Sequence, residues 1–359
     1  MKTEAINLKI VEHLYKDPHQ CIDSFDLLYT TDAMLTILRA KYGNTFIYTE
    51  KDKRITSKNV IKRIASLVIP PKWNSVKIAN VANAHLQAVG RDAKGRKQYK
   101  YHPKWSKLHN QTKFYKMAAF GEKLPQIRHQ VEKDLKQRQW TQTKTLALIV
   151  KLLEETHIRI GNEQYAKKNK TYGLTTLRSR HLSIKNNKMR FEFVGKRGKK
   201  HSVTLKNKKL MRLVNQCEEL PGWELFKYFD ENGNKHTIDS GMVNDYIHKL
   251  SGRLFTAKDY RTWSASIITF EYLKSMGVEA NTNQNKKNIL SAIDQARNAL
   301  GNTRAVLRKY YLHPHIINCY ENGNIATAFN ISDSINDDAF FTASEKAMLQ
   351  LIKTFKPKF

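Results

Sequence analysis

An apolar segment at residues 143–156 constrains the fold of this chain more than any other feature. Its large apolar side chains recur at helical spacing and form a broad stripe: Leu146, Leu148, Ile149, Leu152 and Leu153. A stripe of this width is typical of a helix that packs against other elements of a domain. We therefore expect a helix over Thr143–Thr156 with this face buried.

Three short strands are expected after this helix, in an antiparallel meander. Residues 174–184 have an extended pattern. The segment Met189–Val194 places Phe191 and Phe193 on one face, and residues 203–205 repeat this alternation on a returning strand. A basic turn at Lys196–Lys200 joins the second strand to the third.

The rest of the second half has helical patterns, whereas the first half is mixed. Helices are expected at residues 241–250, 256–275, 286–300, 303–312 and 344–355. Thr256 and Asp259 form an approximate capping box at the start of the second of these, and Gly301 directly after the apolar stripe of the third is suited to end it. In the first half we expect strands at residues 45–49, 76–79, 85–89 and 96–102, and a pair of helices within Asp23–Lys41. A helix at residues 60–68 ends before Pro70 and Pro71, which cannot continue it.

The chain carries a large excess of positive charge. Its 63 Lys and Arg residues outnumber 32 Asp and Glu residues, which gives a net charge of +31. Such an excess destabilises a compact chain unless a polyanion neutralises it, so the charge favours nucleic acid as a partner. The charge gathers in two blocks, Arg91–Lys116 with interleaved aromatic residues and Lys196–Arg212. Each block is either a solvated basic face or one arm of a clamp around a nucleic acid.

Several classes of protein are disfavoured. The three cysteines, Cys21, Cys217 and Cys319, form no CxxC pair, which indicates neither a disulfide framework nor a zinc finger. The longest apolar run, Leu146–Val150, is too short to span a bilayer. Charged residues within Met1–Ile10 argue against a secretory signal. We therefore expect a cytoplasmic protein with no membrane partner.

Familiar cofactor and metal motifs are also missing from the sequence. There is no phosphate-binding GxxxxGK[ST] loop, no HExxH and no cluster of acids for a two-metal nuclease. His313 and His315 flank a proline and predict a structural turn rather than a metal site. We expect no metal and no cofactor, so any phosphoryl chemistry must use Arg, Lys and a side-chain nucleophile.

Six segments, in order over roughly residues 90–314, resemble the small type IB DNA topoisomerases of bacteria and poxviruses. They are Gly90–His102, His157–Asn162, Thr171–Leu177, Phe193–Lys196, Lys258–Trp263 and Leu300–Pro314. The bacterial branch is closer, because the chain has His102-Pro-Lys-Trp and Pro314. Poxvirus enzymes have His where this chain has Asn302, whereas bacterial members resemble this chain there.

The resemblance implies an enzyme that nicks one strand through a covalent 3′-phosphotyrosine and religates it without ATP or metal. Tyr311 takes the place of the nucleophile, because it lies nine residues after Asn302, and the adjacent Tyr310 does not. Arg159 and Arg261 would clamp the non-bridging phosphate oxygens, with Asn302 donating one more hydrogen bond. Lys196 would protonate the leaving 5′ oxygen. Taken singly, each of these residues has an ordinary structural explanation as well.

The resemblance also implies which residues of the first basic block touch DNA: Arg91, Lys94, Arg96, Gln98, Tyr99 and Tyr101. Strict alternation along a strand puts Arg96 and Gln98 on one face and Tyr99 and Tyr101 on the other. All of them can reach DNA only if the strand enters a groove edge-on. We favour contacts from Arg96, Gln98 and Tyr101.

These observations together predict an α+β fold related to the catalytic fold of tyrosine recombinases. We expect a small mixed, β-containing N-terminal DNA-binding domain (residues 1–111) and a linking helical region (112–140). A larger, mainly α-helical catalytic domain with a three-stranded antiparallel sheet (141–330) and a helical tail (331–359) would follow. The expected partner is supercoiled duplex DNA, clamped by a monomer associated with a bacterial nucleoid.

Two other functions remain open on the sequence alone. A tyrosine recombinase would share the catalytic logic, but it would need a helical N-terminal domain and its own His in the segment around Arg261. A non-catalytic DNA architectural protein would explain the net charge but not the spacing between Asn302 and Tyr311.

Overall fold

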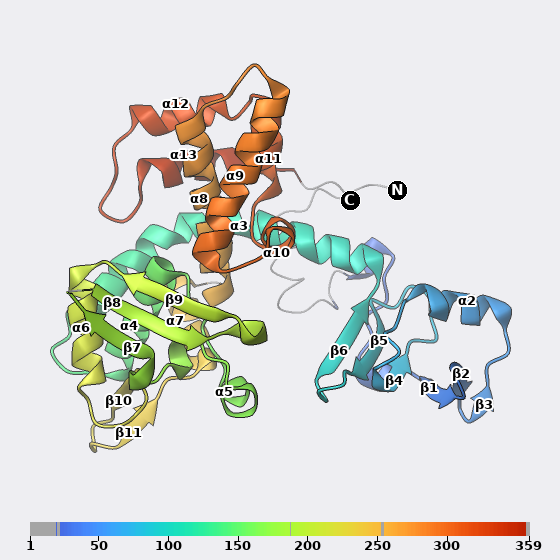
Figure 1. Ribbon diagram of the computed structural model, residues 1–359. Coiled ribbons are helices and arrows are strands. Elements are labelled where there is room, and N and C mark those ends of the chain that lie inside the picture. The colour runs from blue at the N-terminus through green and yellow to red at the C-terminus, as the bar shows by residue number, and fades with distance from the viewer. Residues whose placement is uncertain (1–18, 20–21, 187, 253–254, 357–359) are drawn as a thin grey trace. The chain divides into compact units, whose positions relative to one another are not determined.

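The computed structural model of the chain describes residues 19, 22–186, 188–252 and 255–356 (Figure 1). Cys21 and the segment Met1–Ile10, considered above, lie outside these residues. The chain divides into two compact units, of which the first ends at Tyr115 and the second spans Lys116–Lys356. Helix α3 (Pro103–Leu135) begins in the first unit and ends in the second.

The first unit is built on a six-stranded antiparallel sheet in the order β3-β2-β1-β4-β5-β6. The strands are β1 (Ile37–Tyr42), β2 (Thr45–Glu50), β3 (Lys53–Arg54), β4 (Asn74–Ile78), β5 (Leu86–Arg91) and β6 (Lys97–Tyr101). Helix α2 (Lys58–Ser66) covers the sheet, since its Ile64 packs in one buried cluster with Ile37, Val76 and Ile78. The expected strands and the helix before Pro70 are confirmed.

The pair of helices expected within Asp23–Lys41 is wrong. Two single 3-10 turns, Ile22–Phe25 and Asp32–Met34, precede strand β1. β1 pairs with β2 along one edge and with β4 along the other, so its backbone groups are satisfied within the sheet. Ile37 is buried while Leu38 is exposed, which is the two-residue period of a strand. Long-range pairing therefore overrides the helical spacing of the apolar residues.

The second unit is mainly helical and contains a three-stranded antiparallel sheet, β7-β8-β9, which confirms the expected fold class. Its strands are β7 (Leu182–Lys185), β8 (Lys188–Val194) and β9 (Lys200–Leu205), with a small hairpin of β10 (Lys227–Phe229) and β11 (Lys235–Thr237). Its further helices are α4 (Gln142–Thr156), α5 (Glu163–Asn169), α6 (Lys208–Glu218), α7 (Ser240–Ser251), α8 (Ala257–Met276), α9 (Thr282–Leu300), α10 (Arg304–Tyr310), α11 (Pro314–Glu321), α12 (Ala326–Ser334) and α13 (Ala343–Lys353).

Helix α4, predicted from its apolar stripe, lies at the centre of this unit. It packs against α6, α7, α8, β9 and β10, and its segment from Lys144 to Val150 is buried throughout. The Thr141 side chain accepts a hydrogen bond from the Lys144 amide at its start, and His157 ends it in the left-handed conformation (φ 53°). The burial of α4 on all sides thus fixes where the chain emerges at residue 158.

Two expectations for the second unit are wrong. Residues 174–176 and 179–181 form 3-10 turns rather than a strand, because the amides of residues 174 and 175 bond to the segment after α4 and that of Ser179 bonds to the carbonyl oxygen of Trp223. The β10–β11 hairpin falls where only helices were expected. Lys227, the first residue of β10, is fully buried and donates to the carbonyl oxygens of Glu218, Gly222 and Glu224.

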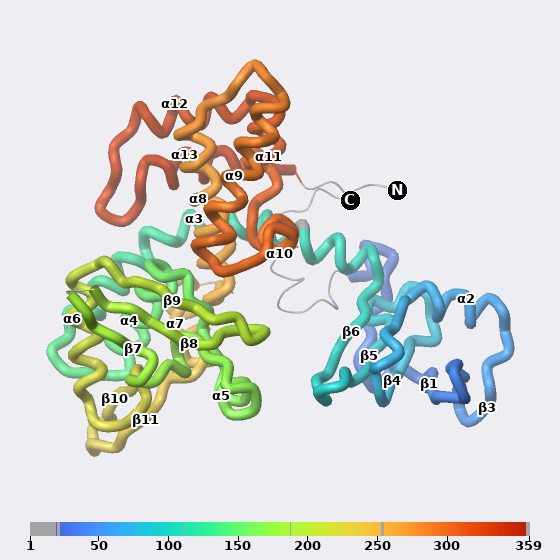
Figure 2. Tube along the Cα trace, viewed as in Figure 1, coloured from blue at the N-terminus to red at the C-terminus, as the bar shows by residue number. Residues whose placement is uncertain are grey.

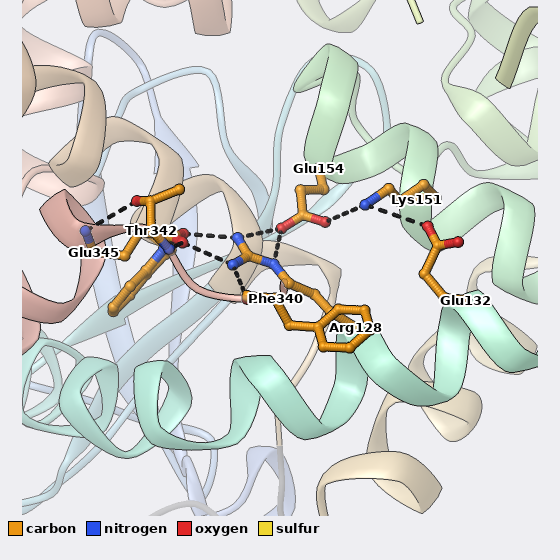
Figure 3. A network of polar contacts seen from close by, with 8 residues as sticks. Arg128, Glu132, Lys151, Glu154, Phe340, Thr342 and Glu345 are labelled. Carbon is orange, nitrogen blue, oxygen red and sulfur yellow. Dashed lines mark hydrogen bonds and ion pairs between the residues drawn. The ribbon is translucent and has the colours of Figure 1, made fainter. Parts of the chain in front are cut away.

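Helix α13 is held to the rest of the unit by a buried polar network around Arg128 (Figure 3). The Arg128 guanidinium donates to Glu154 on α4, to the carbonyl oxygen of Phe340, and through two bonds of 2.7 Å to Glu345 on α13. Glu345 also accepts a 2.8 Å bond from the indole nitrogen of Trp263 on α8. The C-terminal helix is therefore an integral part of this unit. Within the described residues, no helix is both long and apolar enough to cross a membrane.

Candidate active site

Arg159 follows α4 directly, on a segment held by backbone pairing with the residues around Gly173. The Leu174 amide donates to the Arg159 carbonyl oxygen at 2.8 Å, and the Thr175 amide donates to that of Ile160 at 2.7 Å. The approach is so close that a Cβ on Gly173 would lie 2.4 Å from the Arg159 carbonyl oxygen. The glycine in Thr171–Leu177 therefore has a physical reason: it lets this segment position Arg159.

Arg261 lies near the start of α8 and is almost fully buried. Its guanidinium donates to the carbonyl oxygens of His157 and Leu300, the latter at 2.8 Å. Thr256 and Asp259 form the expected capping box at the start of α8, which confirms that prediction. Within the described part of the chain, the Nε atom of Arg261 has no hydrogen-bond partner.

Asn302 joins the two arginines. Gly301 ends α9 in the left-handed conformation (φ 64°), as its position after the apolar stripe predicted, and so directs Asn302 inward. Asn302 Oδ1 accepts a 2.5 Å hydrogen bond from Arg159 and a 3.4 Å bond from Arg261. Its Nδ2 atom is buried and, among the described residues, has no acceptor. The site thus keeps two buried donors, Asn302 Nδ2 and Arg261 Nε, unpaired.

The structure distinguishes the two adjacent tyrosines. Tyr310 is the last residue of α10 and its ring is exposed, with the Lys309 amine 5.4 Å from the ring centroid. Tyr311 turns back toward the core, and the Arg261 guanidinium lies 5.4 Å from the centroid of its ring. Figure 2 shows the chain turning from α9 into α10, the helix that leads to these tyrosines. Tyr311 is thus the tyrosine whose ring lies against Arg261.

Lys196 occupies the turn between β8 and β9. The Gly195 amide donates to the Lys199 carbonyl oxygen at 2.7 Å, which closes the turn, and Lys196 itself is exposed. A cavity of about 180 Å³ connects this turn with the segment after α4 and the end of α9. Lys196, Arg159 and Gly301 all line it. Lys196 therefore lines the same cavity as Arg159.

The electrostatics of the site favour an anion. Burial lowers the pKa of Arg261, and the charge of Arg159 lowers it further. Burial alone would raise the pKa of the Tyr311 phenol, but the positive charges of Arg261 and Arg159 outweigh it, and the pKa lies below its ordinary value. Burial and the charge of Arg261 lower the pKa of His157 to about 4, which keeps that ring neutral at pH 7. Two guanidinium groups that share one acceptor, and that have no carboxylate partner among the described residues, are suited to a phosphate.

The residues expected to touch DNA surround the turn between β5 and β6. Asp92, the one acid of this basic block, accepts hydrogen bonds from the backbone amides of Lys94 and Arg96 and from the side chains of Arg96 and Gln98. The Arg91 side chain donates to the Gly95 carbonyl oxygen. Asp92 therefore orders the turn and holds the side chains of Arg96 and Gln98, two of the residues expected to contact DNA.

Tyr99 and Tyr101 lie on the other face of β6, as the alternation predicted. Their rings stack with centroids 6.0 Å apart and planes at 13°. Both remain exposed, at 44% and 43%. Flat, exposed aromatic faces beside basic side chains are suited to the sugars and bases of a nucleic acid.

Sequence reasoning missed two contributors to the site. The His157 carbonyl oxygen orients Arg261, and His201 packs between the turns that carry Lys196 and Asn302. Neither contribution has a sequence signal, because one is a backbone atom and the other is a single histidine in a strand.

Comparisons with known proteins match both units. Residues 102–332 match the family described as eukaryotic DNA topoisomerase I, catalytic core, and residues 45–92 match bacterial DNA topoisomerase IB, N-terminal domain. The chain is 31% identical to the DNA topoisomerase 1B of Acanthamoeba polyphaga mimivirus over 295 residues, which is 80% of this chain and 88% of the relative. It is 26% identical to the DNA topoisomerase I of Monkeypox virus and to the DNA topoisomerase 1B of Vaccinia virus, over 68% of this chain and 75% of each relative.

Proposed function

Because the chain belongs to the type IB DNA topoisomerases, we propose that it relaxes supercoiled duplex DNA by nicking and religating one strand through Tyr311. Family membership confirms the resemblance drawn from the six sequence segments. The observation that carries the residue assignment is that Arg159 and Arg261 both donate to Asn302 Oδ1, while the Arg261 guanidinium lies against the Tyr311 ring.

In the proposed reaction, the Tyr311 phenol oxygen attacks phosphorus and the bond from phosphorus to the 5′ oxygen breaks. The phenol gives its proton to solvent, and the lowered pKa of Tyr311 makes this loss easier. The phosphodiester bond is exchanged for a 3′-phosphotyrosine of similar energy, so religation needs no ATP. Attack by the free 5′ hydroxyl reverses each step and restores the strand.

Arg159 and Arg261 bind the two non-bridging oxygens, on which negative charge grows in the transition state. They are preorganised, because Asn302 Oδ1 and the carbonyl oxygens of His157 and Leu300 already orient them. The unpaired donors Asn302 Nδ2 and Arg261 Nε then find acceptors on the phosphate. Lys196, facing the cavity from its turn, gives a proton to the leaving 5′ oxygen.

The first basic block and the Lys196–Arg212 block bind the phosphates on either side of the nicked bond. We propose that residues 1–111 form the DNA-binding domain, that a monomer closes around the duplex, and that the enzyme works on the nucleoid in a bacterial cytoplasm. Binding that rests on phosphate contacts should weaken steeply as salt is raised.

Relaxation of a supercoiled plasmid in EDTA without ATP tests the proposal, with wild type beside Tyr311→Phe and Tyr310→Phe. We expect relaxation by wild type and Tyr310→Phe, and none by Tyr311→Phe. The Tyr310→Phe variant is the matched control, because it removes the same hydroxyl from the neighbouring exposed ring. Relaxation by Tyr311→Phe would refute the nucleophile assignment, whereas a wild type that binds DNA without relaxing it would favour an architectural protein.

A further inference from the structure

The imidazole ring of His201 fills the space between two turns of the proposed active site. His201 lies in β9 directly across from Phe193 of β8, and their rings stack with centroids 5.1 Å apart and planes at 13°. The ring edges lie against Gly195 and Gly301. A Cβ on Gly195 would lie 2.6 Å from His201 Cδ2, and one on Gly301 would lie 2.7 Å from Cε1.

Each of these glycines directly precedes a residue of the proposed site. Gly195 precedes Lys196, and Gly301 precedes Asn302. The Gly301 backbone is fixed at the end of α9, where its amide donates to the Asn298 carbonyl oxygen. Since one edge of the ring rests on this fixed turn and another on Gly195, the ring sets how far the Lys196 turn can move toward Asn302.

The ring is suited to this place because it carries no charge. Burial lowers the pKa of His201, and the positive charges of Arg159, Lys199 and Arg261 lower it further. A neutral ring adds no further cation to a cavity lining that already includes Lys196 and Arg159. Its flat shape is the property that the contacts use.

We propose that His201 is a positioning residue that holds Lys196 where it protonates the leaving 5′ oxygen. This inference rests on the proposed function, in which Lys196 is the general acid. Without the ring, the turn at Gly195 loses its closest side-chain contact and keeps only the more distant Phe193 ring, so the Lys196 amine spends less time within reach of the oxygen. A flat ring without nitrogen atoms should hold the turn nearly as well as imidazole does.

The test compares two DNA duplexes in single-turnover cleavage at a mapped site. One has the ordinary phosphodiester and the other has sulfur in place of the 5′ bridging oxygen, so that the leaving thiolate needs no proton. We expect His201→Ala to slow cleavage of the ordinary duplex roughly 10- to 100-fold and to leave the sulfur duplex nearly unaffected. His201→Phe should restore most of the rate on the ordinary duplex.

Each result bears on one assignment. Because the same variant is measured on both duplexes, a fraction of unfolded enzyme cancels in the ratio, and His201→Gln replaces His201→Ala should the latter not fold. Equal slowing on both duplexes would overturn the role of His201. Lys196→Ala is the control: if sulfur does not rescue it, the general-acid assignment itself fails, whereas rescue of Lys196→Ala but not of His201→Ala overturns the inference alone.

Discussion

Removing Arg128 should destabilise the second unit far more than removing any surface cation. Its guanidinium is the shared partner of Glu154 and Glu345, and the side chains of Arg128 and Glu345 are only 15% and 6% exposed. Arg128→Met keeps most of the volume but leaves the buried Glu345 carboxylate without its counter-charge, while Glu154 keeps only Lys151, at 3.7 Å. Breaking a buried pair from one side costs about 3–5 kcal/mol, mostly from the stranded charge.

Urea unfolding followed by circular dichroism measures this cost. With a denaturant slope of about 3 kcal/mol per molar, the midpoint should fall by more than about 1 M. Lys353→Met is the matched control, because Lys353 pairs with Glu122 at 2.7 Å but both side chains are about half exposed. An exposed pair contributes less than about 1 kcal/mol. Equal shifts for the two variants would refute the reasoning.

The pH dependence gives a second check on the same pair. Burial would raise the pKa of Glu345, but its hydrogen bonds and charge interaction with Arg128 hold it below the ordinary value. A carboxyl whose pKa is lowered on folding stabilises the fold above its unfolded pKa of about 4.3, and this contribution is lost as the pH falls through the folded pKa. In Arg128→Met the Glu345 carboxylate has lost its counter-charge and can take up a proton. The difference in the free energy of unfolding between this variant and wild type should therefore become smaller as the pH falls.

Three further predictions concern the site and its DNA-binding strand. Gly173→Ala should slow DNA cleavage by about 100-fold, since the new Cβ would lie 2.4 Å from the Arg159 carbonyl oxygen. Gly241→Ala is the control, because a Cβ there meets only the Asp239 side chain. Equal cleavage rates for the two variants would contradict the account. Asp92→Asn should tighten binding to duplex DNA about two- to fivefold, because it removes the ion pair between Asp92 and Arg96. Weaker binding in a fluorescence titration would show that DNA binding depends more on the order of the turn than on the removed negative charge. The pKa of His157 is lowered from about 6.5 to about 4, so this group should cost about 2 kcal/mol of stability when the pH falls from 7.5 to 5, because the unfolded chain takes up the proton first. His181 titrates in the same direction, so the shift of the urea midpoint between the two pH values should shrink in His157→Asn by the share of His157; an unchanged shift would contradict the account.

The sequence predicted best those elements whose cause is local. Helix α4 was predicted from its apolar stripe, and the end of α9 from Gly301, since a stripe and a left-handed cap depend on neighbouring residues. The capping box of Thr256 and Asp259 belongs to the same class. Strand β1 was missed because its structure comes from pairing with β2 and β4, which no local pattern reports.

Lys227 shows the same limit for a single side chain. A lysine at the start of a short strand is expected in solvent, yet its amine is buried against three carbonyl oxygens of the preceding loop. That place depends on how residues 218–224 fold back, which the sequence pattern did not indicate. The predicted helical tail packs as part of the second unit, because Glu345 on α13 completes the hydrogen-bond network of Arg128.

The candidate site was predicted as a set of residue types, whereas its geometry comes from backbone atoms. Arg159 is positioned by backbone bonds to residues 174 and 175, and Arg261 by two carbonyl oxygens. Such contacts leave no signature except the small residues that permit them. Gly173 is the small residue that permits the backbone contacts of Arg159. The family resemblance included its segment, Thr171–Leu177, but did not explain why a glycine is needed there.

The unpaired donors at Asn302 and Arg261 explain why this geometry suits a transferring phosphate better than a stable ion pair. A buried donor without an acceptor costs about 1–3 kcal/mol, so a site built for stability alone would satisfy both or replace them with apolar groups. Here the amide oxygen of Asn302 already binds both arginines, which leaves its nitrogen and Arg261 Nε directed elsewhere. In the proposed reaction, an incoming phosphate oxygen would meet donors that are already oriented and dehydrated. The free protein would bear the cost of the two unpaired donors, and their bonds to the growing negative charge would recover it in the transition state.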